Sequence, residues 1–183
     1  NSEKIIFTSI SRIIPYKGHN LLIELFEILC KKNNNIYLQI VGDTLPYYEK
    51  YLNKLKLDVK EKHLENKICF TGFRNDVISI LESSSFFIHT PVLPDPFPTV
   101  IFEAIKSKTP IITNNLGGAY EILNNGRNGL IIKNNFIHES AKKILKYIKE
   151  KELYLRNNDN AFNFVSKNFT IQKFEKKLLK IIE

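Results

Sequence analysis

Short apolar runs rich in β-branched residues alternate along this chain with segments in which apolar residues recur every three or four positions. Because the short runs are apolar throughout, they predict parallel strands that are covered on both faces. The predicted strands are 4–9, 36–41, 67–70, 86–90, 110–113 and 129–132. This alternation predicts an α/β fold, a single doubly wound parallel sheet of about six strands with helices on both faces.

The segments between the predicted strands carry helical periodicity. One apolar stripe covers 21–29 and a second covers 48–55, each with the spacing of an amphipathic helix. Asp76 is a residue type that caps helices, and it predicts the start of a short third helix. A further helix is predicted over 99–106.

The last part of the chain predicts a helical tail. From about 138 to 183 the pattern indicates three helices, with one break near Asn157–Asn158 and another at Asn168–Thr170. We find no linker or repeat that divides the chain, so residues 1–183 are expected to form one domain.

Length and composition limit the class of protein, but they say little about its function. A chain of 183 residues is long enough for one domain with a sizeable core. No apolar run approaches the length of a membrane span, and no signal peptide is visible. Cys30 and Cys69 lack metal-ligand spacing, so we expect two reduced, buried thiols. The chain has no Met, even at position 1, and we therefore expect it to be part of a longer protein.

The formal net charge is +8, which raises the question of an anionic partner. Lysines are spread along the chain without a nucleic-acid-binding signature, so we expect solvated helix faces and no nucleic acid. Contact with an anionic membrane is a second hypothesis, which vesicle co-sedimentation would test.

A proline-rich bend carries the most informative chemistry, because it sets two carboxylates, Asp95 and Glu103, eight positions apart. Proline cannot continue a strand and is tolerated in a first helical turn, so a helix begins here. Thr99, Val100 and Ile101 then offer backbone N–H groups without an intrahelical acceptor, which is typical of a phosphate site. Two flanking carboxylates suit the hydroxyl groups of a ribose and a hexose, which indicates a sugar nucleotide.

Two cations lie in the loop after the first predicted strand. The guanidinium of Arg12 and the ammonium of Lys17 suit a diphosphate, and Lys17 stands beside Gly18 at the start of a helix. In doubly wound sheets, ligands bind beyond the carboxyl ends of the strands. Five motif residues follow successive strands: Arg12, Gly42, Gly72, Asp95 and Gly117. The sequence therefore predicts one site along this edge of the sheet.

The bend from Asp95 to Glu103 resembles the acidic motif of GT-B glycosyltransferases, in particular the retaining group called family 4 or glycosyltransferase group 1. Further segments match in the same order: Ser11–Gly18, Ile40–Asp43, Phe70–Phe73, and Gly117–Ile122 with Asn128–Gly129. The resemblance covers essentially the whole chain. It implies a Rossmann-like domain, the C-terminal, donor-binding half of a GT-B fold, over residues 1–183.

The resemblance also implies roles for individual residues. Arg12 and Lys17 would hold the donor diphosphate, Asp95 would contact the hexose, and Glu103 would accept hydrogen bonds from the ribose. These four are the expected catalytic residues. The expected donor-binding residues are Gly18, Gly42, Phe73, Arg74, Phe97, Pro98, Thr99, Val100, Gly117 and Gly118. No metal and no cofactor are expected, because GT-B chemistry is metal-independent.

The expected activity is transfer of a hexose from a UDP or GDP sugar to an acceptor hydroxyl, in bacterial-type polysaccharide or glycoconjugate synthesis. The acceptor site belongs to an N-terminal domain that this chain does not contain, so we expect the chain to be inactive alone. We expect a cytoplasmic location, with membrane association through the full-length enzyme. The base, sugar, acceptor and linkage stay open.

Two alternatives stay open as well. The family usually has Gly where this chain has Ser11, Glu where it has Asp95, and Gly near Lys108, which favours a non-catalytic nucleotide-sugar-binding module. A GT-B-like sugar-nucleotide epimerase is the second alternative. NAD-dependent chemistry is less favoured, since no G-x-G-x-x-G follows the first strand. His89 is at the end of a predicted strand and is interpreted as a packed residue.

Overall fold

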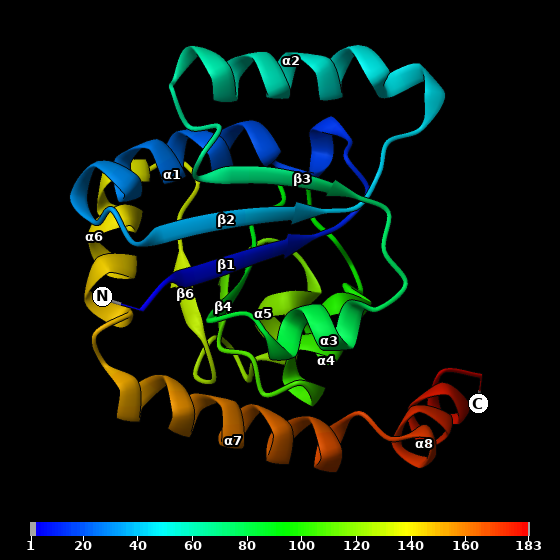
Figure 1. Ribbon diagram of the computed structural model, residues 1–183. Coiled ribbons are helices and arrows are strands. Elements are labelled where there is room, and N and C mark those ends of the chain that lie inside the picture. Colours follow the sequence, from blue (N-terminus) through cyan, green and yellow to red (C-terminus); the bar gives the residue numbers. More distant parts are fainter. Residues whose placement is uncertain (1–2, 183) are drawn as a thin grey trace.

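The computed structural model describes residues 3–182, apart from the side chains of residues 177, 181 and 182. Within them, six strands form one parallel sheet in the order β3-β2-β1-β4-β5-β6 (Figure 1). The strands are β1 (Ile5–Ile10), β2 (Ile36–Val41), β3 (Ile68–Gly72), β4 (Phe86–His89), β5 (Ile111–Asn114) and β6 (Leu130–Ile132). The predicted doubly wound sheet is therefore confirmed, with each strand within two residues of its predicted bounds at either end.

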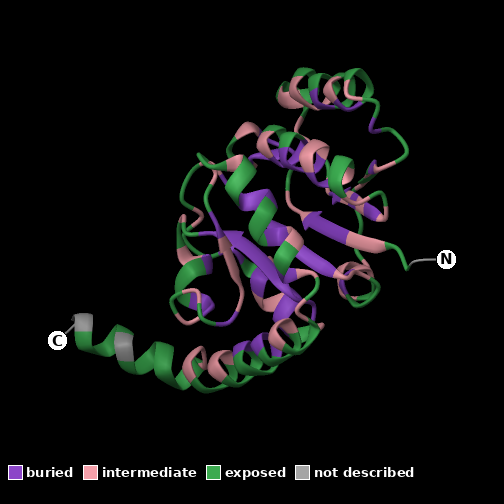
Figure 2. Ribbon diagram, turned by 90° about the vertical axis from the view of Figure 1, so that its left-hand side faces the viewer, coloured by how far each residue is buried: buried purple, intermediate pink, exposed green. Residues whose placement is uncertain are grey.

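Helices cover both faces of this sheet (Figures 1 and 2). On one face lie α1 (His19–Lys32), α2 (Glu49–Glu61) and α6 (Ile137–Tyr147). On the other lie α3 (Val77–Glu82), α4 (Thr99–Lys106), α5 (Gly118–Ile122) and α7 (Lys151–Asn168). The last helix, α8 (Ile171–Ile182), extends from the body of the molecule, and short 3-10 turns occur at Pro15–Lys17 and Pro46–Tyr48.

Each face of the sheet has its own hydrophobic core, because successive side chains of a strand point to opposite sides. In β4, Phe86 and Ile88 pack with the residues of α1 and α6, whereas Phe87 packs with α4. All three side chains are buried. Full burial of an apolar side chain of this size contributes about 1.5–3 kcal/mol, so both helical layers are held firmly on the strands.

The predicted first break of the helical tail is wrong. Helix α7 runs without interruption through Asn157 and Asn158, and the break lies instead at 148–150. Nδ2 of Asn157 donates to the hydroxyl of Tyr147 at 3.1 Å, and Nδ2 of Asn158 donates to the carbonyl of Lys108 at 2.5 Å. Because these amides donate to partners outside α7, they do not compete for the backbone hydrogen bonds of the helix. The second predicted break, between α7 and α8, is confirmed.

Two local predictions also need correction. Asp76 does precede α3, but its carboxylate binds the guanidinium of Arg74 instead of capping the helix. Cys69 is exposed rather than buried, because β3 is an edge strand, and Cys30 is partly buried. Burial raises the pKa of the Cys30 thiol to about 11, so this side chain is a poor nucleophile.

Helix α8 is amphipathic and largely exposed. Its apolar side chains Ile171, Phe174, Leu178 and Leu179 are all open to solvent. A cavity of about 520 Å³ lies beside them, between Phe97 and the junction of α7 with α8. Among the described helices, none combines the length and the apolar character that crossing a bilayer requires.

Candidate functional site

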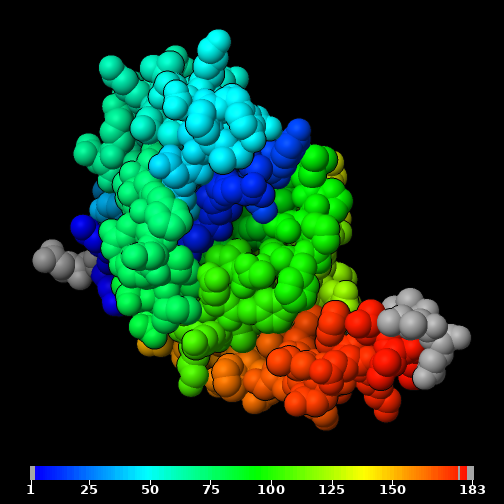
Figure 3. All heavy atoms as spheres, turned by 90° about the vertical axis from the view of Figure 1, so that its right-hand side faces the viewer, coloured from blue at the N-terminus to red at the C-terminus, as the bar shows by residue number. Residues whose placement is uncertain are grey.

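A cavity of about 560 Å³ opens at the carboxyl edge of the sheet. Figure 3 looks onto this edge and shows a hollow between the segments that follow β1, β3 and β4. From β1 the chain builds the sheet outward through β2 to β3, and it then crosses back to β4 on the other side of β1, where the strand order reverses. Such a switch point is where doubly wound sheets bind ligands.

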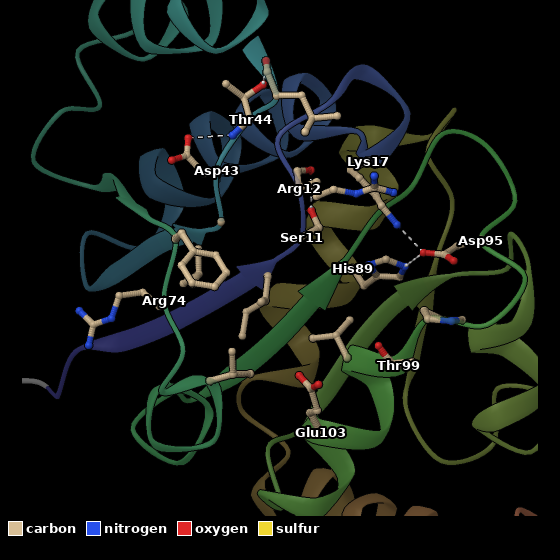
Figure 4. A pocket seen from close by; sticks show the side chains of 18 of the residues that line it. Ser11, Arg12, Lys17, Asp43, Thr44, Arg74, His89, Asp95, Thr99 and Glu103 are labelled. Carbon is tan, nitrogen blue, oxygen red and sulfur yellow. Dashed lines mark hydrogen bonds and ion pairs between the residues drawn. The ribbon is translucent and has the colours of Figure 1, made fainter. Parts of the chain in front are cut away.

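Most of the residues predicted for the site lie in the wall of this one cavity. They come from the loops after β1, β2, β3 and β4 and from the first two turns of α4 (Figure 4). The predicted residues in the wall are Arg12, Lys17, Gly42, Phe73, Arg74, Asp95, Phe97, Pro98, Thr99, Val100 and Glu103. The structure therefore brings together both cations and both carboxylates that the sequence singled out.

Lys17 and Asp95 form an ion pair in the wall of the cavity. Nζ of Lys17 lies 2.5 Å from Oδ2 of Asp95, and both side chains are about four-fifths buried. The imidazole of His89 points toward the same oxygen, with Nε2 at 3.8 Å (Figure 4). The cation expected for the diphosphate and the acid expected for the sugar thus bind each other in the wall of the cavity.

Arg12 is the cation that stays available. Its side chain is exposed at the mouth of the cavity, and no carboxylate of the described residues pairs with its guanidinium. Its backbone is fixed, because the carbonyl of Arg12 accepts a hydrogen bond from the N–H of Ile14 at 3.1 Å. A guanidinium presented in this way is suited to two oxygens of a phosphate.

The tip of helix α4 supplies backbone donors. Pro98 has no N–H and precedes the helix, so the N–H groups of Thr99 and Val100 are the ones presented at the cavity. The sequence prediction that Ile101 also offers a free N–H is wrong, because this group donates to the carbonyl of Pro98 at 3.0 Å. Glu103 lies one turn further along the same helix, in the cavity wall.

Three predicted glycines lie behind the wall and do not line the cavity. A Cβ on Gly18 would come within 2.1 Å of the carbonyl oxygen of Thr90. A Cβ on Gly117 would come within 2.2 Å of the carbonyl oxygen of Asp95, and the N–H of Gly118 donates to that same oxygen at 2.8 Å. These glycines hold the loops that carry Lys17 and Asp95, and the donor contact expected of them stays a prediction.

Arg74 and Phe73 form the outer part of the wall. Nε of Arg74 donates to Asp76 at 2.7 Å, and Figure 4 shows its side chain directed away from Lys17 and Asp95. Phe73 is 77% exposed. Neither side chain contacts a partner inside the cavity. The part of this segment that has a fixed position in the wall is therefore its backbone.

Two histidines are buried beside the ion pair. Burial lowers the pKa of His19 to about 4, and it lowers the pKa of His89 to about 4, with Lys17 adding to the second shift. Both rings are therefore neutral near pH 7. Nε2 of His19 lies 3.3 Å from the hydroxyl of Ser11, which lines the cavity.

Sequence reasoning missed Thr44 and gave His89 and Asp43 no role in the site, although all three lie in the cavity wall. The hydroxyl of Thr44 donates to the carbonyl of Ile13 at 2.8 Å, which joins the loop after β2 to the loop after β1. A signal was present in the sequence, because each residue lies within three positions of the carboxyl end of a predicted strand. Among the described residues, no three His, Cys, Asp or Glu side chains gather as metal ligands.

Comparison with known proteins extends these observations. An uncharacterised glycosyltransferase of Haemophilus influenzae is 30% identical over 172 residues, which cover 93% of this chain and 47% of that protein. The crystal structure of Anabaena HepE in complex with UDP-glucose matches with a TM-score of 0.86 and 26% identity, covering 98% of this chain and 48% of HepE. The chain thus spans about half the length of these relatives.

A third match concerns the fold alone. The crystal structure of the C-terminal domain of LpcC, a glycosyl transferase group 1 protein from Francisella tularensis, gives a TM-score of 0.80 at 23% identity. The match covers 92% of this chain and 88% of that domain, which agrees with the predicted half of a GT-B fold. The family described as Glycosyl transferases group 1 matches residues 1–164. Since this match covers most of the sequence, the chain belongs to the glycosyl transferases group 1 family.

Proposed function

We propose that this chain is the donor-binding half of a retaining, family 4-type glycosyltransferase. The whole enzyme transfers a hexose from a nucleoside diphosphate sugar to an acceptor hydroxyl, in polysaccharide or glycoconjugate synthesis of the bacterial type. One observation carries the proposal: a single cavity holds two cations, a helix tip and two carboxylates. HepE, which is similar over nearly the whole chain, binds UDP-glucose, and this supports the same class of donor.

In this proposal the diphosphate lies between the loop after β1 and the tip of α4. Arg12 contacts it with its guanidinium, and the N–H groups of Thr99 and Val100 donate to it from the other side. Lys17 leaves Asp95 and binds the same diphosphate. These groups stabilise the negative charge that develops on the leaving nucleoside diphosphate, and they are in place before the reaction begins.

The two carboxylates contact the two sugars. Glu103, one turn inside α4, accepts hydrogen bonds from the ribose hydroxyls, and Asp95 accepts them from the hexose. Asp95 is shorter than Glu by about 1.5 Å, the length of one carbon–carbon bond. Asp95 nevertheless lies in the cavity wall with its carboxylate paired to Lys17, which supports a contact with the bound hexose.

The chemistry is proposed to need neither a metal nor a cofactor, since the cations and the helix tip balance the charge of the diphosphate. Transfer by the full-length enzyme should therefore be unchanged by EDTA. A loss of activity on chelation that returns with added Mg²⁺ or Mn²⁺ would contradict this part of the proposal.

We further propose that an N-terminal GT-B domain supplies the acceptor site and that residues 1–183 form the C-terminal one. The exposed apolar side chains of α8 and the neighbouring cavity beside Phe97 are where such a domain would pack. The isolated chain should bind the donor and transfer no sugar, whereas the protein with both halves should transfer it. Turnover by the isolated chain would overturn the assignment of the two roles.

The proposed location is cytoplasmic, with peripheral membrane contact through the full-length enzyme. Cys30 and Cys69 are both free thiols, as is usual in a reducing compartment, and the net charge of +8 suits an anionic surface. Co-sedimentation with vesicles that contain phosphatidylglycerol, but not with phosphatidylcholine alone, is the expected result. Equal binding to both would contradict the membrane contact.

Calorimetric titration of the chain with UDP, GDP, ADP and their sugars tests the central proposal. At least one nucleotide should bind, and Arg12→Ala should weaken it about tenfold or more, since a charge-assisted hydrogen bond contributes about 1.5–3 kcal/mol. Arg127→Ala is the matched control, because Arg127 is exposed outside the cavity and its loss changes the net charge equally. Equal effects of both variants would contradict the diphosphate site.

Analysis of the reaction products separates the competing functions. A non-catalytic binding module would bind the donor, yet the full-length protein would transfer no sugar to any acceptor. An epimerase would convert the donor sugar into its epimer without an acceptor. Analysis of the products by nuclear magnetic resonance distinguishes these two outcomes from transfer.

A further inference from the structure

A buried nitrogen in the cavity wall has no hydrogen-bond partner among the described residues. It is Nε2 of His89, whose side chain is only 4% exposed. The polar atom that it faces is Oδ2 of Asp95 at 3.8 Å, too far for a hydrogen bond, and Nζ of Lys17 holds that oxygen at 2.5 Å (Figure 4). A buried N–H donor without an acceptor lowers the stability of the folded protein, so the position of this nitrogen requires an explanation.

The ring of His89 is held rigidly. His89 ends β4 and pairs with Thr113 of β5, whose hydroxyl also donates to the carbonyl of His89 at 2.9 Å. The imidazole stacks on the ring of Phe87, with 6.3 Å between the ring centroids and 14° between the planes. Any closer approach between His89 and Asp95 must therefore come from the aspartate.

The protonation of His89 is also determined by its surroundings. Burial and the neighbouring charge of Lys17 lower its pKa to about 4, so the ring is neutral near pH 7 and has one N–H. A carboxylate facing Nε2 favours the tautomer with the proton on that nitrogen. His89 thus presents a neutral N–H donor to Asp95.

Asp95 has a fixed backbone and a side chain that can move. Its carbonyl accepts a hydrogen bond from Gly118, and the backbone of Gly117 packs directly against it. Its carboxylate is held by Lys17, whose long side chain has a stronger partner available when a diphosphate enters the cavity. At that moment Asp95 would lose the cation that holds it.

We propose that His89 is a positioning residue for Asp95 in the donor-bound protein. When Lys17 has turned to the diphosphate and a hexose has displaced the water beside Asp95, Oδ2 of Asp95 moves by roughly 1 Å onto the N–H of His89, which brings the pair to hydrogen-bond distance. The carboxylate then stays directed at the transferred sugar. With a diphosphate alone, water solvates the carboxylate and this hydrogen bond is not formed. This inference rests on the proposed function, because it takes a nucleoside diphosphate sugar as the ligand.

The test compares the affinity of the chain for a nucleoside diphosphate and for its sugar. Calorimetry with UDP and UDP-glucose, and with GDP and GDP-mannose, measures how much the sugar adds in the pair that binds more tightly. His89→Leu should reduce this sugar contribution about three- to tenfold, the effect of one hydrogen bond, and leave the affinity for the diphosphate alone unchanged. His89→Gln, whose amide can place a donor near the position of Nε2, should restore most of it.

A double-mutant cycle shows whether His89 acts through Asp95. Asp95→Ala should remove the sugar contribution, and His89→Leu should then have no further effect. An additive loss in the double variant would overturn the proposal, because His89 would then act without Asp95. Parallel losses of UDP and UDP-glucose binding, or no effect of His89→Leu, would overturn it too.

The thermal midpoint of each variant provides the structural control, since a variant that merely unfolds loses both ligands together. The proposed function fails in a different way, because the wild-type chain would then bind none of these four ligands and neither ADP nor its sugars. Binding of the diphosphates with an unchanged sugar contribution in every variant rejects only the role of His89.

Discussion

Lys17 and Asp95 are 78 positions apart in the chain, yet Nζ of the lysine lies 2.5 Å from Oδ2 of the aspartate. Lys17 comes from the 3-10 turn that follows β1, and Asp95 comes from the loop between β4 and α4. The two strands are neighbours in the sheet, so their loops meet at its carboxyl edge. In the proposed function, each residue is thus the partner that the other leaves when a donor binds.

Removing the charge of Asp95 should therefore raise the affinity for a nucleoside diphosphate that carries no sugar. Asp95→Asn releases Lys17 and removes a negative charge beside the incoming phosphates. An ion pair that is partly solvated contributes about 0.5–1 kcal/mol, so UDP should bind about two- to fivefold more tightly. Calorimetry measures this directly, and weaker UDP binding by the variant would contradict the competition.

Glu103 should distinguish ligands that carry a ribose from those that do not. Glu103→Gln removes a charged acceptor for the ribose hydroxyls, and a hydrogen bond to a charged group contributes about 1.5–3 kcal/mol. Binding of UDP should weaken at least tenfold, whereas binding of inorganic pyrophosphate should not weaken. If both ligands lose affinity equally, Glu103 acts on the charge of the site and not on the ribose.

Gly18 should tolerate no side chain. Its φ is 75°, in the region that favours glycine, and a Cβ would lie 2.1 Å from the carbonyl oxygen of Thr90. Gly18→Ala should lower the free energy of unfolding by at least about 3 kcal/mol or prevent folding. Urea denaturation followed by circular dichroism measures the change.

Gly72→Ala is the matched control for this prediction. Gly72 has nearly the same φ, 73°, but a Cβ there would meet no atom within 4 Å. Only the backbone strain remains, about 1–2 kcal/mol. Equal losses in the two alanine variants would show that the contact between Gly18 and Thr90 is unimportant for stability.

The two buried histidines predict how stability depends on pH. The pKa of His19 and that of His89 are about 4 in the folded protein, below the ordinary value of 6.5, because burial disfavours the charged ring. Between these values the unfolded chain binds more protons than the folded one, so stability rises with pH. Their contribution is complete above about pH 6.5 and is lost progressively as the pH falls toward 4.

Urea denaturation at about pH 7 and about pH 5 tests this dependence. Each ring should lower the free energy of unfolding by about 2 kcal/mol over that interval. His89→Leu should remove about half of the change. The pKa of Glu27 is lowered by its hydrogen bond with Lys31. The stability that Glu27 contributes is therefore lost mainly at more acidic pH, outside this interval. Stability that is constant between the two pH values would contradict the burial of neutral rings.

Asn158 should anchor helix α7 to the domain. Its amide donates to the carbonyl of Lys108 at 2.5 Å, and the side chain is buried. Asn158→Ala leaves that carbonyl without its partner and should cost about 1–3 kcal/mol in the free energy of unfolding. Asn163→Ala, at an exposed position of the same helix, should be neutral or slightly stabilising, since Ala favours helices.

Much of the fold could be predicted from local patterns. Strand β2 has its predicted bounds, because the run 36–41 is continuously apolar or β-branched apart from Tyr37 and Gln39 and is bounded by Asn33–Asn35 and Gly42. The break at Asn157–Asn158 was predicted wrongly, because that prediction also used only the local pattern. Asparagine disfavours helices when its amide has only the local backbone to bind, and here the partners lie on α6 and beyond α4.

By itself, the sequence determined the alternation of strands and helices, the edge of the sheet where the cavity opens, and the helix tip that begins after Pro98. These features depend on the spacing of residues within a few positions of one another. Only the tertiary structure decided that Lys17 pairs with Asp95, that His89 is buried facing the same carboxylate, and that three glycines support the wall from behind. The physical reason is that such contacts depend on which strands become neighbours and on how fully their loops exclude water.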